Sequence, residues 1–227
     1  MHLLTPAALA SAMLAAAGTA SAQLDLLQSF DPSDSGSMNS LGYDAVTETI
    51  FVHTQSGVTY QQYDRAGLFL GTITKPFGGG NDDDIEFVDQ AITISGVNVP
   101  AGSLLSIENE NDPPRVIAVD ISDSSILAQV DSDGVLLGQW VGGAYSMATG
   151  TFFCVDWQRD TIQEIDLADG TILSEFPVAP TGATPFDIFF GDIDILDADG
   201  LIYAVSSAQN RIRVMPSGQA KIRAPVI

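Results

Sequence analysis

A repeat of about 50 residues runs through most of the chain, and it constrains the fold more than any other feature. Four segments share one order: an apolar strand, a polar turn, an alternating strand, a turn with Gly or Ser, and another apolar strand. These segments are residues 49–73, 103–130, 151–176 and 201–226. Equivalent apolar positions recur in them at spacings of 54, 48 and 50 residues, namely Phe51, Leu105, Phe153 and Tyr203. A chain with this repeat folds as a series of similar units that pack on one another.

A further strand is expected before each segment, at 40–45, 84–92, 144–149 and 193–199. Four short strands in each repeat are typical of a β-propeller blade, in which every sheet covers a face of the next. Asp169-Gly170, Asp199-Gly200 and Ala66-Gly67 are suited to tight hairpin turns. A β-sandwich is the alternative, but it gives no reason for the repeat. We therefore predict an all-β chain, either a β-propeller or a fragment of one, with about four four-stranded blades.

The repeat also resembles known sequences. YDAVTETIFV (43–52), VTYQQYDRAGLFLGTI (58–73) and MATGTFFCVDWQRDTIQEIDLADGTILSEF (147–176) are similar to the blades of secreted bacterial propellers of the NHL and YVTN type. The resemblance covers most of residues 40–226 and concerns the repeat, not one protein. Such repeats occur in sugar-lactone hydrolases, binding proteins and cell-surface proteins, so the resemblance implies a fold and leaves the activity open.

Completeness of the domain stays open at this stage. LDLLQSF (24–30) resembles the outer strands of the repeats and is able to complete the last blade. QAKIRAPVI (219–227) is equally expected to be the outer strand of the fourth blade. A small ring, part of a longer propeller and an association of chains are all consistent with this pattern.

The amino-terminal segment has the features of a signal peptide. An apolar run at 6–17 is too short to span a bilayer, and it is followed by Ala20-Ser21-Ala22, a small-residue cleavage pattern. The segment departs from the usual form because it has no Lys or Arg. We predict that residues 1–22 are a signal peptide and that 23–227 form the repeat domain. The protein is then exported, to the periplasm or the extracellular space, and no later segment is apolar enough to span a membrane.

Charge limits the partners. There are 29 Asp and Glu residues against 8 Lys and Arg, which gives a net charge of -21. Such a surface repels nucleic acid and anionic membranes, so both are excluded as partners, and it favours cations. The basic residues are unevenly distributed: the last seventeen positions hold four of them and no acid. We expect this basic end to help pair an edge of the sheet.

Two acidic segments of the second repeat predict a calcium site. One follows the glycines at 78–80, and the other lies between the expected second and third strands of that blade. Loops of a propeller that emerge on one face commonly bind its ligand, and dense oxygen donors suit Ca²⁺. The predicted ligands are Asp82, Asp83, Asp84, Glu86, Glu108, Asn109 and Glu110. The alternative is an ordinary solvated acidic surface.

Other candidate motifs are weaker. Residues 192–200 (DIDILDADG) depart from a calcium-loop pattern at Ile195, and we interpret them as a strand followed by a hairpin turn. Cys154 is expected to be a buried core residue, and His53 stands alone, without a nucleophile motif. Trp140 and Trp157 are expected to pack between blades. No catalytic residue is therefore predicted.

Three functions fit these features. The first is a non-catalytic, exported binding or surface protein, stabilised by calcium, whose ligand is a glycan, a protein or a small molecule. The second is a metal-dependent hydrolase resembling the lactonase propellers, for which Glu86, Glu108, Asn109 and Asp192 have suitable side chains. The third is a structural module of a larger assembly. Clustering of the oxygen donors in one blade favours binding, whereas acids from three or more blades around a channel would favour the enzyme.

Overall fold

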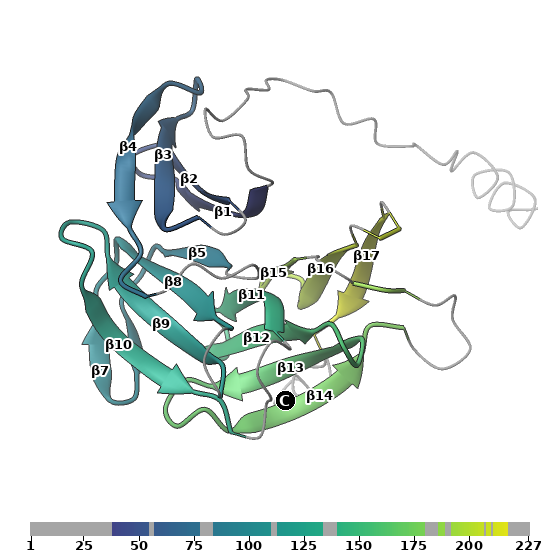
Figure 1. The fold of residues 1–227 in the computed structure, drawn as a ribbon. Coiled ribbons are helices and arrows are strands. Elements are labelled where there is room, and N and C mark those ends of the chain that lie inside the picture. The colour runs from purple at the N-terminus through teal and green to yellow at the C-terminus, as the bar shows by residue number, and fades with distance from the viewer. Residues whose placement is uncertain are drawn as a thin grey trace, which may run out of the picture. The chain divides into compact units, whose positions relative to one another are not determined.

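The computed structural model of the chain describes nine ranges of residues, all of which lie in one compact unit, Asp31–Ile227. The ranges are 38–54, 57–77, 84–109, 113–133, 140–179, 186–188, 192–206, 208–209 and 211–217. Within these ranges the regular structure consists of β-strands (Figure 1). The described residues include no helix that could span a membrane. The predicted signal peptide lies outside the described residues and stays a prediction.

Four antiparallel sheets form the four blades of a β-propeller. Blade 1 contains β1 (Met38–Asp44), β2 (Thr49–Thr54), β3 (Thr59–Asp64) and β4 (Phe69–Thr74). Blade 2 contains β5 (Ile85–Val88), β8 (Ser103–Glu108), β9 (Arg115–Asp120) and β10 (Ile126–Asp131). Blade 3 contains β11 (Trp140–Ser146), β12 (Thr151–Asp156), β13 (Thr161–Asp166) and β14 (Ile172–Pro177). Blade 4 contains β15 (Ile193–Leu196), β16 (Leu201–Ser206) and β17 (Arg211–Pro216).

The repeat predicted from the sequence is confirmed. The four equivalent apolar residues all lie in the second strand of a blade, namely Phe51 in β2, Leu105 in β8, Phe153 in β12 and Tyr203 in β16. The predicted hairpin glycines have positive φ angles of 83° at Gly67, 80° at Gly170 and 63° at Gly200. Blade 4 has three strands in the part of the chain that the structure describes. Residues 219–227, expected as its outer strand, lie outside the described residues.

One predicted strand is wrong. The sequence pattern gave a single strand over 84–92, but β5 ends at Val88 and a separate hairpin follows, with β6 (Ile92–Ile94) and β7 (Val97–Val99). Ser95 and Gly96 form its turn with φ angles of 48° and 77°, the left-handed pair that a two-residue hairpin needs. The inserted hairpin lies between Phe51 and Leu105 in the chain and accounts for the longest of the repeat spacings.

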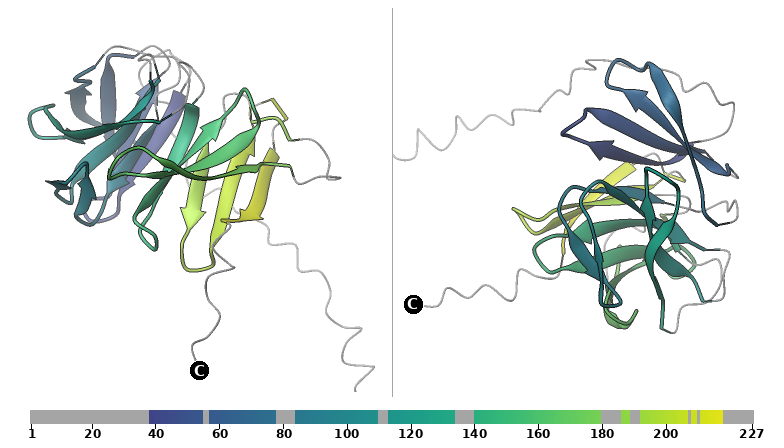
Figure 2. Two further views of the ribbon diagram at one scale, coloured as in Figure 1. Left: turned by 90° about the horizontal axis from the view of Figure 1, so that it is seen from below. Right: turned by 90° about the vertical axis from the view of Figure 1, so that its left-hand side faces the viewer.

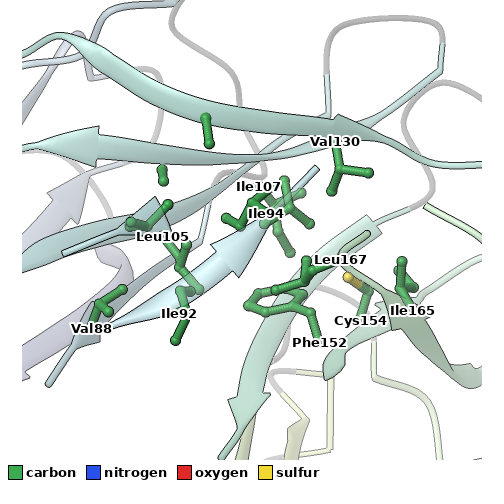
Figure 3. Close-up of a cluster of buried hydrophobic side chains, with 14 of the residues drawn as sticks. Val88, Ile92, Ile94, Leu105, Ile107, Val130, Phe152, Cys154, Ile165 and Leu167 are labelled. Atoms are coloured by element: carbon green, nitrogen blue, oxygen red, sulfur yellow. The ribbon is translucent and has the colours of Figure 1, made fainter. Parts of the chain in front are cut away.

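Apolar clusters fill the spaces between successive blades. Blades 2 and 3 share one cluster, which includes Leu105 and Ile107 from blade 2 and Phe152 and Cys154 from blade 3 (Figure 3). Trp140 is buried in the same cluster, so it packs between blades as predicted. Another cluster joins blades 1 and 2, and a third joins blades 3 and 4, whose sheets lie side by side in Figure 2. These contacts fix the first strand of each blade around a common space.

Candidate functional site

A cavity of about 370 Å³ lies where the first strands of the four blades meet. Its lining comes from β1, β5, β11 and β15, the first strand of each blade in chain order, and from Asp192 just before β15. Apolar and polar groups share the wall. The lining residues are Leu41, Gly42, Tyr43, Ile85, Glu86, Phe87, Gly143, Ala144, Asp192, Ile193 and Asp194. We call this space the axial cavity.

The strand registers place one residue of each blade at an equivalent axial position. Opposite the four equivalent apolar residues lie Gly42 in blade 1, Glu86 in blade 2, Ala144 in blade 3 and Asp194 in blade 4. Blades 1 and 3 thus have small residues at the position where blades 2 and 4 have acids. The small residues leave room for a cavity, and the acids give it a charge.

Strand alternation directs the acids of blade 2 towards blade 3. Ile85 and Phe87 of β5 pack towards blade 1, where Phe87 stacks on Phe51 at a ring-centroid distance of 5.7 Å. Asp84 and Glu86 have the opposite orientation. The Gly143 N–H donates to Asp84 Oδ2 at 2.7 Å, and the Tyr145 N–H donates to Glu86 Oε2 at 2.5 Å. Both donors belong to β11, which is the edge strand of its sheet, so the carboxylates satisfy backbone groups that no strand pairs.

Blade 4 repeats this pattern. Asp192 and Asp194 lie 108 residues after Asp84 and Glu86, and Ile193 between them is buried in the cluster shared with blade 3. The alternation predicted for this segment, acids on one face and isoleucines on the other, is confirmed. The Ile193 N–H donates to Asp192 Oδ1 at 2.7 Å, and the Gly143 N–H that donates to Asp84 also lowers the pKa of Asp192, so the carboxyl groups of Asp84 and Asp192 lie near one backbone donor.

Burial and mutual repulsion raise the pKa values of these acids. Burial, with the Asp192 and Glu86 charges, raises the pKa of Asp84 well above its usual range. Burial and the charges of Asp194, Asp192 and Asp89 raise the pKa of Glu86 to about 8. Burial and Asp194 raise the pKa of Asp192 to about 7. Among the described residues that line the cavity, none is a Lys, Arg or His. The site therefore favours a proton or a cation near neutral pH.

The structure separates the residues of the predicted calcium site. Glu86 lines the axial cavity, and Asp84 lies behind its wall, bonded to Gly143. Glu108 forms an ion pair with Arg115 of the neighbouring strand β9. Asn109 bonds the backbone of Trp140 in blade 3, where its Nδ2 donates to the Trp140 carbonyl at 2.5 Å and its Oδ1 accepts from the Trp140 N–H at 3.3 Å. Each of these four side chains thus has a protein partner.

The remaining predicted ligands, Asp82, Asp83 and Glu110, lie outside the described residues. Within the described residues, no group of three or more His, Cys, Asp or Glu side chains is gathered as a metal site. Calcium binding by the acidic loops of blade 2 stays a prediction.

Sequence reasoning missed Asp194 as a cavity residue and gave Asp192 only a secondary place. The signal was available in the repeat. Asp84-x-Glu86 and Asp192-x-Asp194 occupy the same position in two blades, and the first strand of a propeller blade is the one nearest the axis. Two blades contribute acids to the described cavity, fewer than the three that would have favoured the enzyme hypothesis.

Comparison with known proteins supports the fold only. No protein-family profile matches the chain, and no curated protein matches its sequence. Among solved structures, glutaminyl cyclase of Myxococcus xanthus matches with a TM-score of 0.54 and 12% sequence identity, over 78% of this chain and 72% of the other. A protein of unknown function from Bacteroides caccae matches with a TM-score of 0.42 and 14% identity, over 80% of this chain and 61% of the other. The chain thus spans less than two thirds of the Bacteroides protein.

Proposed function

We propose that this protein is an exported binding propeller whose axial cavity takes a small molecule with a positively charged amine and an apolar body. The observation that carries the proposal is that Glu86 on β5, Asp192 just before β15 and Asp194 on β15 line one cavity. Folding therefore places three carboxyl groups of like charge around one cavity.

The charge of the ligand follows from the cost of that arrangement. Ionised carboxylates at the cavity repel one another, and burial weakens their hydration. A cationic group bound between β5 and β15 removes the repulsion and supplies hydrogen-bond donors to the carboxylate oxygens. An anionic ligand would add to the repulsion, and a neutral ligand would leave it in place.

The apolar part of the ligand follows from the walls. Leu41, Tyr43, Ile85 and Phe87 line the same cavity as the acids. Small-molecule sites are commonly apolar with a few convergent polar groups, in cavities from about 300 Å³ upwards. A volume of about 370 Å³ therefore suits an alkyl or aromatic amine better than a bare ion.

Binding of n-hexylamine, with n-hexanol as its neutral counterpart, tests the proposal by titration calorimetry at pH 7.5. We expect hexylamine to bind and hexanol to bind at least tenfold more weakly, because only the amine neutralises the acids. Glu86→Gln should weaken amine binding at least tenfold. Asp120→Asn, which changes a carboxylate at the hairpin turn after β9, is the matched control and should bind normally. Equal binding of the amine and the alcohol would contradict the proposal.

Calcium is the second cation to test. A thermal melt with calcium and then with excess chelator measures whether a site is occupied, because a ligand that binds the folded state raises the midpoint. A calcium shift that survives Glu86→Gln and is lost in Asp82→Asn would place the metal at the loops of blade 2, apart from the axial cavity. The calcium-stabilised binding protein would then be the correct description.

An acid–base enzyme is the second candidate function, and the pKa values favour it. A carboxyl group with a pKa near 7 or 8 is suited to transfer protons at neutral pH, and Glu86 and Asp192 both fall in this range. The Myxococcus protein of similar fold is a glutaminyl cyclase. Mass spectrometry of a glutaminyl peptide incubated with the wild-type protein and with Glu86→Gln tests this candidate. Turnover that Glu86→Gln abolishes would make the protein an enzyme.

A further inference from the structure

The face of blade 4 that points away from blade 3 is apolar and exposed. Val205, Ile212 and Val214 of β16 and β17 are 44%, 68% and 51% exposed, and Leu196 of β15 is 42% exposed. The strand register places Asp194, Tyr203 and Val214 in one row across this face. A contiguous apolar patch of this kind usually marks a surface that another molecule covers.

Blade 2 shows what covers the equivalent face. There the same row consists of Glu86, Leu105, Ala118 and Ala128, and its three apolar members are 1%, 0% and 7% exposed because blade 3 packs over them. Asp84 and Glu86 complete the junction by accepting the N–H groups of β11. The blade 2 junction therefore has two parts: an apolar row and an acid-x-acid pair that bonds the first strand of the next blade.

In the described part of the chain, blade 4 has both parts, and no blade packs over them. Asp192 and Asp194 occupy the positions of Asp84 and Glu86, and Tyr203 occupies the position of Leu105. The occupant that fits is thus a blade whose first strand has an unpaired edge. By the same register, Leu41 and Tyr43 of β1 are the equivalents of Gly143 and Tyr145, the two residues whose N–H groups are bonded in blade 3.

We infer that blade 4 docks blade 1 of a second copy of this chain. Within one chain, Leu41 and Tyr43 stand across the axial cavity from Asp192 and Asp194 and are 58% and 44% exposed, so the described part of blade 1 does not pack on the face of blade 4. In the dimer, Asp192 and Asp194 of one copy accept the Leu41 and Tyr43 N–H groups of the other. A two-fold axis lets each copy supply blade 1 to its partner, so both exposed faces are buried.

The net negative charge of the chain favours a contact between two copies that is made through an apolar face. The net charge of -21 makes most approaches of two copies repulsive. The apolar residues of the blade 4 face carry no charge, and its two acids meet backbone donors instead of carboxylates. A face of this composition is a surface on which two strongly acidic chains can associate.

Size-exclusion chromatography with light scattering on the chain from residue 23, without added ligand, tests the inference. We expect a dimer at about 50 µM and at least a tenfold rise in its dissociation constant for Val214→Asp. Leu173→Asp is the matched control, because Leu173 is also 51% exposed and lies on β14, the outermost strand of blade 3. It should leave the dimer intact, and circular dichroism should show the same melt for both variants at low concentration.

Three results would overturn the inference: a wild-type monomer at all concentrations up to about 100 µM, a dimer that Val214→Asp leaves unchanged, or equal weakening by Leu173→Asp. A monomer whose Asp192 and Asp194 region is protected from hydrogen exchange would indicate that the chain covers this face itself. Leu41, Tyr43, Asp192 and Asp194 also line the axial cavity, so the dimer contact and the amine compete for them. Because the measurement is made without ligand, its failure does not bear on the proposed amine binding.

Discussion

The acids at the hairpin turns and the acids at the axial cavity are chemically alike and have opposite electrostatic environments. At the turns, Asp44 accepts the Val46 N–H at 2.8 Å, and Asp120 accepts the Ser122 N–H at 2.7 Å. Hydrogen bonds from Thr47 and Val46 lower the pKa of Asp44 against the opposing effect of burial, and bonds from Ser122 lower that of Asp120. At the cavity, burial and neighbouring acids raise the pKa of Glu86 to about 8.

The difference explains how one strongly acidic sequence serves two purposes. Asp64, Asp156 and Asp166 also accept backbone N–H groups of the turns that follow them, so many of the acids cap hairpins. These carboxylates each have donors within a few residues, but burial raises the pKa of Asp156, whose Oδ2 lies 3.5 Å from Arg159 Nη1. At the cavity, Asp84 and Glu86 accept N–H groups of blade 3, and Asp192 and Asp194 accept the adjacent Ile193 and Ile195 N–H groups. Burial and neighbouring acids nevertheless raise the pKa values of Glu86 and Asp192. Composition alone therefore overstates the number of acids available to bind a cation.

Removal of an axial carboxyl group should have the largest effect on stability. Asp84→Ala leaves the buried Gly143 N–H without its bond from Asp84 and opens a small space, which should cost about 2 to 3 kcal/mol of unfolding free energy. Asp84→Asn keeps an acceptor of the same shape and should cost much less. Urea denaturation at pH 7 measures both. Equal losses for Ala and Asn would mean that charge, and not the hydrogen bond, is what Asp84 contributes.

The next largest effect should be the change of stability with pH that the axial acids cause. A folded pKa above the unfolded value means that the folded state holds a proton which the unfolded state has lost, so stability falls as pH rises towards the folded pKa. Between pH 6.5 and 8.5 the unfolding free energy should fall by about 2 to 3 kcal/mol, because Glu86 and Asp192 keep a proton in the folded state that they have lost in the unfolded state.

The pH window matters because His53 acts in the opposite direction. Burial and the Lys75 charge lower the pKa of His53 to about 4, so its contribution to stability rises with pH between about 4 and 6.5. Above pH 6.5 this contribution is constant. The double variant Glu86→Gln, Asp192→Asn should flatten the fall between pH 6.5 and 8.5, and an unchanged slope would show that other groups cause it.

The fold was largely predictable because its determinants are local and repeated. Apolar alternation and turn dipeptides recur in each blade, so Phe51, Leu105, Phe153 and Tyr203 could be aligned without a structure. The β6–β7 hairpin was missed although Ser95-Gly96 is a turn signal, because residues 89–92 were assigned to the first strand of the blade and no strand was expected over 93–99. Strand alternation was applied to the fourth repeat and not to the second.

The site was only half predictable because its geometry depends on contacts between blades. Asp84 and Glu86 were selected for their acidity, but nothing near them in the sequence shows that Gly143 and Tyr145 supply their donors 59 residues away. Glu108 and Asn109 were grouped with them for the same acidity and oxygen content. Their actual partners, Arg115 and the Trp140 backbone, follow from the pairing of β8 with β9 and the packing of blade 2 on blade 3.

A turn acid should have a smaller effect than the axial acids. Asp44→Ala removes the acceptor for the Val46 and Thr47 N–H groups, which stand near solvent and can bond water instead, so the loss at pH 7 should be about 0.5 kcal/mol. Because the folded pKa of Asp44 is lowered, its contribution is present above pH 4 and is lost as pH falls below it. Asp44→Asn keeps the acceptor and is the control. If Asp44→Ala lost as much unfolding free energy as Asp84→Ala, acids at the turns and acids at the axis would not differ in their contribution to stability.

The smallest effect should come from Asp169, at the hairpin between β13 and β14. Its Oδ1 accepts the Thr171 N–H at 3.0 Å, and bonds from Thr171 lower its pKa, but the carboxylate is fully exposed to water. Water replaces it when Asp169 is changed to Ala, while Gly170 with its φ of 80° keeps the turn. The thermal midpoint at pH 7 should not move measurably. A clear decrease would show that turn acids contribute through their charge to the rest of the fold, and that the two environments differ less than their pKa values indicate.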